Sequence, residues 1–180
     1  MTEEKALVEN LKNPKRQEEA FRALMGLYKK RLYWHIRKIV LSHDDADDVL
    51  QNTFIKVFKN IHSFNEDSKL YSWMYRIASN EAITFINQKA KKQQVSLSDL
   101  QYEMAENLQF ENDFTGDEIQ LLLQKAIVTL PHKQQLVFNM KYFDEMKYTE
   151  ISEILETSVG ALKASYFHAV NKIEEYLKTH

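Results

Sequence analysis

Cysteine is absent from this chain of 180 residues, and glycine and proline are scarce, with 3 and 2 copies. Without cysteine the chain has no disulfide and no thiolate zinc site, which fits a reducing compartment. Tight hairpins and sheet turns need glycine and proline, whereas helices joined by polar connectors need few of either. The composition therefore predicts an all-α protein.

Long apolar runs are missing as well. No stretch approaches the roughly 20 apolar residues that a membrane-spanning helix needs. The acidic start, MTEEKALVEN, lacks the apolar run that is typical of a secretion signal. We therefore expect a cytoplasmic protein.

The net charge of -2 conceals an uneven distribution. Residues 1–95 hold 17 lysines and arginines against 12 acidic residues, residues 96–130 hold 1 against 7, and residues 131–180 hold 6 against 7. A basic block is thus followed by an acidic connector and a nearly neutral block. We expect two small helical domains, at residues 1–94 and 117–180, joined by an acidic linker at 95–116 with room for one short helix.

Hydrophobic periodicity predicts three helices in the basic block, at about 15–41, 44–61 and 69–91. Their apolar stripes are Phe21, Leu24, Met25, Tyr28, Leu32, Ile36 and Ile39; Ala46, Leu50, Phe54, Val57 and Ile61; and Leu70, Met74, Ile77, Ala78 and Phe85. Ser42 or Asp44 could cap the second helix. Four more helical segments are expected in the last block: DEIQLLLQKAIVTL, HKQQLVFNMKYF, YTEISEIL and VGALKASYFHAVNKIEEYL.

No catalytic constellation is visible. The chain has no glycine-rich phosphate loop and no histidine pair at metal-binding spacing on one helix face. Asp44, Asp45, Asp47 and Asp48 lack the glycine bend of a loop cation site, so acidic capping of a helix explains them better than a metal does. We expect no enzyme, no cofactor, no metal and no small-molecule substrate.

The second predicted helix has an unusual outer face. The side opposite its core carries Asp45, Asp48, Asn52, Ile55 and Lys59. A lone exposed isoleucine is common in proteins. An apolar centre with a charged rim is equally typical of a protein-binding surface. The pattern alone leaves both interpretations open.

The third predicted helix offers a similar choice. One row holds Ser72, Arg76, Asn80, Ile83 and Asn87, with Trp73 at its edge and a basic run beyond it. Aromatic rings can stack on unpaired bases, and the polar loop HSFNEDSK could border a pocket for a flipped base. On the alternative interpretation, Trp73 and Tyr75 are ordinary core aromatics.

The last two predicted helices have the outline of a helix-turn-helix, with Ser158 as a good N-cap for the second. The residues expected to point inward from that second helix are Val159, Leu162, Tyr166, Ala169 and Ile173. Two alanines and a serine keep its other face slim, so its backbone can approach a groove closely. The segment SVGALKASYFHAV, however, holds one lysine and no arginine.

Three blocks, taken in order, resemble the bacterial extracytoplasmic-function sigma factors, which are transcription initiation factors with two helical domains called region 2 and region 4. The blocks are DDADDVLQNTFIKVFKNI, SKLYSWMYRIASNEAITFINQKAKK and LPHKQQLVFNMKYFDEMKYTEISEILETSVGALKASYFHAVNKI. The resemblance covers the chain from about Ala20 to Leu177. It implies that the protein binds core RNA polymerase, directs it to promoter DNA and catalyses no reaction itself.

The resemblance also implies roles for individual residues. The polymerase contacts would be Asp45, Asp48, Gln51, Asn52 and Ile55. The minus-ten promoter element would be melted and read by the loop at 63–69 and by Trp73, Arg76, Asn80 and Asn87, with phosphate contacts from Lys89, Lys91 and Lys92. The minus-thirty-five element would be read by Ser158, Ala161, Lys163, Ser165 and His168. An anti-sigma partner, often one attached to the membrane, would cover these surfaces, and the acidic linker would lie in the RNA exit path of polymerase.

Some positions depart from the family pattern. Glu145 and Glu156 stand where glycine is frequent, and a non-glycine residue at positive φ costs on the order of 1 kcal/mol. Ser165 and His168 stand where arginine is frequent. This low charge keeps open an alternative, a sigma-like protein-binding regulator that has lost promoter recognition. A repressor independent of polymerase is a further rival, but it would need a dimerisation element that the sequence does not show.

Overall fold

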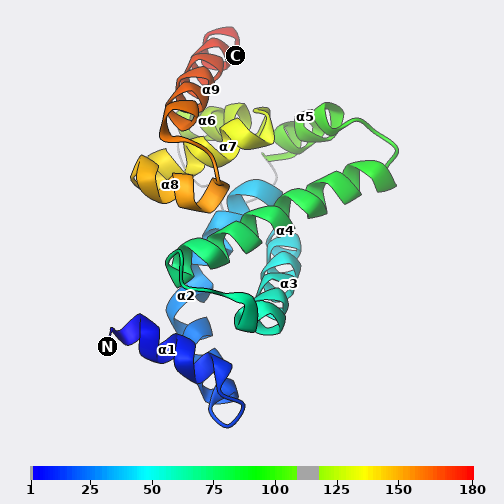
Figure 1. Cartoon of the computed structure of the whole chain (residues 1–180). Coiled ribbons are helices and arrows are strands. Elements are labelled where there is room, and N and C mark those ends of the chain that lie inside the picture. Colours follow the sequence, from blue (N-terminus) through cyan, green and yellow to red (C-terminus); the bar gives the residue numbers. More distant parts are fainter. Residues whose placement is uncertain (1, 109–117) are drawn as a thin grey trace. The chain divides into compact units, whose positions relative to one another are not determined.

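The computed structural model describes residues 2–108 and 118–180, and every regular element within these ranges is helical. The α-helices, labelled in Figure 1, are α1 (Glu3–Lys12), α2 (Gln17–Val40), α3 (His43–Asn60), α4 (Leu70–Lys92), α5 (Leu97–Asn107), α6 (Glu118–Val128), α7 (His132–Phe138), α8 (Tyr148–Leu155) and α9 (Val159–Thr179). A short 3-10 helix, η1 (Ile61–Ser63), follows α3, and a π-helical segment, η3 (Asn139–Phe143), follows α7. The all-α prediction is confirmed.

The chain divides into two compact units, Met1–Ala82 and Ile83–His180. Their boundary lies inside α4, which is one continuous helix. The short helix expected in the acidic linker is α5, while residues 109–116 of that linker lie outside the described residues. The domain limits at 1–94, 95–116 and 117–180 therefore stay a prediction.

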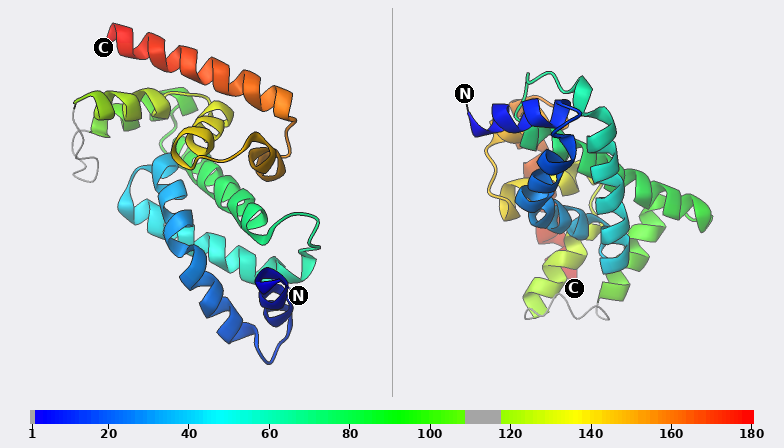
Figure 2. Two further views of the ribbon diagram at one scale, coloured as in Figure 1. Left: turned by 90° about the vertical axis from the view of Figure 1, so that its left-hand side faces the viewer. Right: turned by 90° about the horizontal axis from the view of Figure 1, so that it is seen from below.

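In the first unit α2 and α3 lie side by side, and α1 packs against α2 (Figures 1 and 2). All five residues of the stripe predicted for α3 are buried, from Ala46 to Ile61. On α2 the buried members are Leu24, Leu32, Ile36 and Ile39, whereas Phe21, Met25 and Tyr28 are half-buried. Hydrophobic periodicity does not predict α1, because its ten residues bury only Val8 and Leu11.

Helix α4 is attached to α2 by a buried polar and aromatic contact. The His35 ring stacks on Tyr75 with centroids 4.2 Å apart, and His35 Nε2 lies 2.7 Å from Ser79 Oγ. The Ser79 hydroxyl donates to the Tyr75 carbonyl at 2.8 Å, so it accepts from His35, whose Nε2 carries the proton. Tyr75 is thus a core aromatic, as the alternative interpretation held.

The row of polar residues on α4 is not uniformly exposed. Ser72 is only 1% exposed, although it lies on the same helical row as Arg76 and Asn80. Periodicity identifies the most apolar face of a helix, while a neighbouring element can cover a polar flank beside it.

The second unit has its core between α6, α7 and α9. The buried cluster consists of Ala126, Ile127, Leu130, Phe138, Ala169 and Ile173. Helix α5 joins this unit through its packing on α6 and through Gln101, whose Nε2 donates to the Leu130 carbonyl at 2.9 Å. All four helical segments expected in the last block are present, the second of them as α7 continued by η3.

Candidate functional site

The outer face of α3 carries the first group of candidate residues. Ser42 caps the helix, since its Oγ accepts from the Asp45 N–H at 3.3 Å, and Asp44 and Asp45 lie in the first turn beside the positive end of the helix dipole. The cap sets the residue at which α3 begins, and the helical repeat then determines which side chains lie on its outer face. Asp48, Gln51, Asn52 and Ile55 are exposed and Asp45 is half-buried. Ile55 keeps 43% of its surface in solvent, so it belongs to a surface and not to the core.

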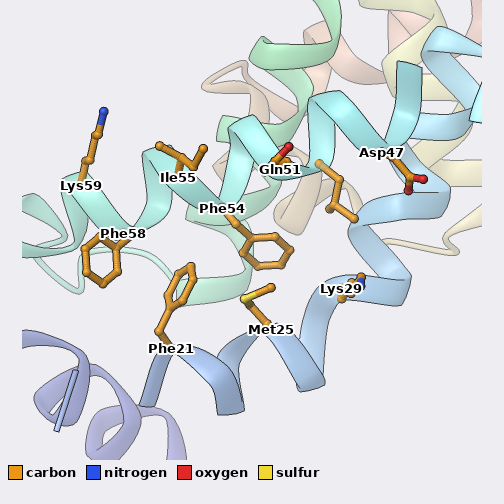
Figure 3. Close-up of a pocket in the computed structure, with 10 residues that line it drawn as sticks. Phe21, Met25, Lys29, Asp47, Gln51, Phe54, Ile55, Phe58 and Lys59 are labelled. Atoms are coloured by element: carbon orange, nitrogen blue, oxygen red, sulfur yellow. The ribbon is translucent and has the colours of Figure 1, made fainter. Parts of the chain in front are cut away.

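An apolar groove of about 550 Å³ lies beside this face, between α2 and α3. Figure 3 shows Phe54 and Phe58 of α3 turned toward Phe21 and Met25 of α2, with Ile55 at the edge. The Phe21 ring meets Phe58 edge-on at 5.2 Å and Phe54 at 6.0 Å.

Polar side chains border the same groove. They are Lys29, Asp47, Gln51 and Lys59. Phe58 remains 42% exposed, and the sequence patterns did not select it. Its signal was the aromatic residue three positions after Ile55. An apolar centre with charged groups around it is the composition of a protein-binding surface.

The first half of α4 presents a mixed aromatic and polar face. Trp73 is half-buried because its ring packs on Phe64, with centroids 5.2 Å apart. Arg76 is half-buried and Asn80 is exposed, one and two turns further along. The preceding loop carries Glu66 at φ 64°. The structure therefore brings these three side chains onto one side of a helix that begins directly after the polar loop.

The second half of α4 divides the remaining candidates. At 100° per residue, Asn87 and Lys91 continue the side that holds Asn80, whereas Lys89 and Lys92 point to the other side. The basic run therefore does not form a single row with Trp73. All three lysines, Lys89, Lys91 and Lys92, nevertheless border one hollow of about 580 Å³ together with Phe85.

The turn between α8 and α9 is tied by short hydrogen bonds. Glu156 ends α8 in the left-handed conformation at φ 52° and ψ 42°, and Glu145 also has φ 52°. Both glutamates thus have the positive φ that glycine adopts without strain. The Ser152 hydroxyl donates to the Thr157 carbonyl at 2.6 Å, which closes the turn.

Helix α9 starts at its predicted cap, where Ser158 Oγ accepts from the Ala161 N–H at 3.2 Å. The candidates Ser158, Ala161, Lys163 and His168 are exposed, while Ser165 is half-buried. The Lys163 ammonium lies 5.9 Å from the centroid of the Tyr148 ring, so this cation lies toward α8. Leu162, Ala169 and Ile173 face the core as expected.

Phe167 is a surface residue of α9 that sequence reasoning did not select. It is 62% exposed and contacts His168 edge-on at 5.9 Å. It lies one turn after Ala164, which is also exposed. The outer face of α9 is therefore apolar as well as weakly cationic. Phe167 follows Tyr166, which was predicted to point inward, and the hydrophobic pattern therefore did not mark Phe167 as a surface residue.

Within residues 2–108 and 118–180, no group of three or more histidine or acidic side chains could hold a metal ion, although His43 lies 3.3 Å from Asp47. Among the described helices, none is both long and apolar enough to cross a membrane.

Two family models match the chain in sequence order. Residues 24–92 match Sigma-70 region 2, and residues 120–173 match Sigma-70, region 4. The chain is 27% identical to the ECF RNA polymerase sigma-E factor of Haemophilus influenzae, covering 97% of this chain and 95% of that protein. It is 29% identical to the ECF RNA polymerase sigma factor SigW of Bacillus subtilis, covering 91% and 92%. The chain belongs to the extracytoplasmic-function group of the sigma-70 family. It is therefore a transcription initiation factor that directs RNA polymerase to promoters, and sigma factors are non-enzymatic.

Solved structures of a sigma factor and of CnrH share the fold of this sigma factor. The sigma factor RpoE, crystallised with the anti-sigma factor NepR from Bartonella quintana, gives a TM-score of 0.65 at 19% identity and covers 88% of this chain and 96% of that one. CnrH in complex with the cytosolic domain of CnrY gives 0.67 at 18% identity, covering 98% and 97%.

The two matched regions contain all the residues predicted to contact polymerase or DNA. Region 2 includes α3, α4 and most of α2, and region 4 includes α7, α8 and most of α6 and α9. Helices α1 and α5 lie outside both matches.

Proposed function

We propose that this sigma factor docks on core RNA polymerase through the outer face of α3. The contacts would be Asp45, Asp48, Gln51, Asn52 and Ile55. The observation that carries this assignment is the exposed Ile55 among polar neighbours, directly beside the groove that contains Phe58. Docking removes apolar surface from water at the centre, while carboxylates and amides at the rim set orientation.

We assign the minus-ten element to the start of α4 and the loop before it. Trp73 would stack on an unpaired base, and Arg76 and Asn80 would bond base edges or phosphate. Asn87 and Lys91 continue the same side of the helix. Phosphate contacts from Lys89, Lys91 and Lys92 would supply affinity that falls with salt.

We assign the minus-thirty-five element to the outer face of α9. The contacts would be Ser158, Ala161, Lys163, Ser165 and His168. The small side chains let the backbone approach a groove closely, but the low charge makes the intrinsic affinity weak. Because polymerase and the minus-ten contacts hold the second site nearby, a weak contact is sufficient to set the register.

The remaining assignments concern the partners and the place of action. One similar solved structure is a complex of a sigma factor with an anti-sigma factor, so we propose that an anti-sigma factor, one attached to the membrane or free, covers these surfaces in this protein. The protein would act in the bacterial cytoplasm, where polymerase is. It would need no cofactor and catalyse no reaction. The domain limits of 1–94 and 117–180, with an acidic linker between them, belong to the same proposal.

Reconstitution with core polymerase tests the function directly. We expect promoter-directed transcripts from fragments of the native genome. A purified complex that gives no transcript from any fragment would favour the regulator that has lost promoter recognition, which the weak charge of α9 motivates. Failure to form any complex would overturn the proposal.

A further inference from the structure

Helix α1 lies outside the region 2 match, yet it is an integral part of the first unit. It buries Val8 and Leu11 and packs against both α2 and η1. Figure 2 shows α1 beside the end of α3, where the chain passes through η1 into the loop that precedes α4. The helix is therefore next to the segment assigned to the minus-ten element.

Two side chains of α1 bond the two ends of that loop. Lys12 Nζ donates to the carbonyl of Phe64 at 2.6 Å, and Glu4 Oε1 accepts the backbone N–H of Leu70 at 2.9 Å. Both bonds are partly buried, and both involve a charged group, which makes a hydrogen bond stronger than a neutral one.

Glu4 supplies what α4 itself lacks. The first turn of α4 holds no acidic residue, although a helix N-terminus is stabilised by negative charge and needs partners for its first N–H groups. The Glu4 carboxylate meets both needs at Leu70. Burial, followed by the nearby charge of Glu4, raises the pKa of Tyr28 on α2.

Lys12 acts at the other end of the loop, on a residue that supports a candidate base contact. Phe64 is 2% exposed, and its ring packs on Trp73. A bond that holds the Phe64 backbone therefore also limits the orientation of the Trp73 ring.

The loop between these anchors is short and polar. Asn65 Nδ2 donates to Asp67 Oδ2 at 2.7 Å, and Glu66 between them has positive φ. Glu4 and Lys12 are two helical turns apart, about 12 Å along the axis of α1. One rigid helix can thus set the separation of the entry and the exit of the loop.

We propose that α1 is a positioning element for the promoter-opening loop, with Glu4 and Lys12 holding its two ends in the conformation that captures unpaired bases. This inference rests on the proposed assignment of the loop and α4 to the minus-ten element. Neither residue contacts DNA in this arrangement. Their contribution is preorganisation, because a loop that is already ordered loses less conformational entropy when it binds.

The test uses the full chain with core polymerase on a promoter fragment identified by transcription. The variant Glu4→Met with Lys12→Met removes both bonds and keeps the apolar stems. Glu4→Gln with Lys12→Arg keeps an acceptor and a donor. Lys5→Met with Glu9→Met is the matched control, because both side chains are exposed on the same helix. The rate of strand opening is read from 2-aminopurine placed in the minus-ten non-template strand.

We expect the Met pair at positions 4 and 12 to slow opening roughly tenfold, as the loss of about 1.4 kcal/mol of preorganisation would do. The conservative pair should recover most of that rate, and the control pair should match the unmodified protein. Affinity for core polymerase should be unchanged in all three, and amide exchange should rise at residues 64–72 but not in α3.

Equal opening rates for the two Met pairs would overturn the inference. So would a loss of polymerase affinity in parallel with the opening rate, because α1 would then only stabilise the fold. Asn80→Ala distinguishes a failure of the α1 inference from a failure of the minus-ten assignment. If Asn80→Ala slows strand opening while the two Met pairs open at equal rates, only the role of α1 is wrong. An unchanged opening rate in Asn80→Ala would instead remove the minus-ten assignment on which that role depends.

Discussion

Replacing Ile55 is expected to weaken polymerase binding by an amount that follows from its exposure. The side chain is 43% exposed, so docking can remove at most that share of its surface from water. Full burial of an isoleucine is worth about 1.5–3 kcal/mol, so the docking share is roughly 0.6–1.3 kcal/mol. Ile55→Ala should therefore raise the Kd for core polymerase about three- to ninefold.

Ile55→Glu should have a much larger effect. It removes the same apolar contact and adds a carboxylate that must lose its water in the interface, on the helix face that already carries Asp48 two turns away. A buried unpaired polar group costs about 2 kcal/mol or more, so the Kd should rise on the order of 100-fold. The folded state should tolerate the change, because the new carboxylate remains in solvent until polymerase binds.

Titration of labelled sigma factor with core polymerase measures both effects, and helicity and urea denaturation measure the fold. Ile119→Glu on α6 is the matched control, since Ile119 is 70% exposed and belongs to the second unit, whereas the proposed surface belongs to the first. Equal affinities for Ile55→Glu and Ile119→Glu would refute the assignment of α3. Collapse of the fold in Ile55→Glu would mean that the isoleucine is a core residue.

Three further predictions concern the second unit. Glu145→Gly should raise the free energy of unfolding by about 1 kcal/mol, because the backbone has φ 52° there. Glu174→Gly in the exposed part of α9 should lower it by about 1 kcal/mol, and urea denaturation showing the same sign for both would contradict the backbone argument. Burial lowers the pKa of His132 in the folded protein, so the unfolded chain binds a proton on this residue more readily. The contribution of neutral His132 to the free energy of unfolding is therefore complete above about pH 6.5, the usual pKa of histidine. It is lost as the pH falls through the lower pKa of the folded state. A Tm series from pH 7.5 to 5.5 should therefore fall less steeply for His132→Asn, and parallel curves would exclude this residue. His168→Ala and Phe167→Ala should each reduce minus-thirty-five footprint protection at constant polymerase affinity, and unchanged protection would remove that residue from the reading face.

Local features of the sequence were sufficient to predict the helices and several of their ends. Ser158 caps α9 as expected, and Ser42, one of the two candidates with Asp44, caps α3, since a serine hydroxyl needs only the N–H groups of the next turn. The apolar stripe of α3 is buried as predicted because every member lies on one helical face. Scarce glycine and proline indicated the all-α class, because the tight turns of a sheet need these residues at particular positions. The order of three motif blocks was enough to indicate the family.

Tertiary structure alone decided which neighbour covers each face. Periodicity distinguishes an apolar side from a polar one, but it does not say what packs against the flank, and so it does not predict that the polar residue Ser72 is buried. The groove beside Ile55 needs Phe21, which lies on a different helix and comes near only when α2 and α3 pack together. The bond from Glu4 to Leu70 joins positions 66 residues apart in the chain. Local propensity carries no information over that separation, because such contacts form only when burial of Val8 and Leu11 brings α1 to its place.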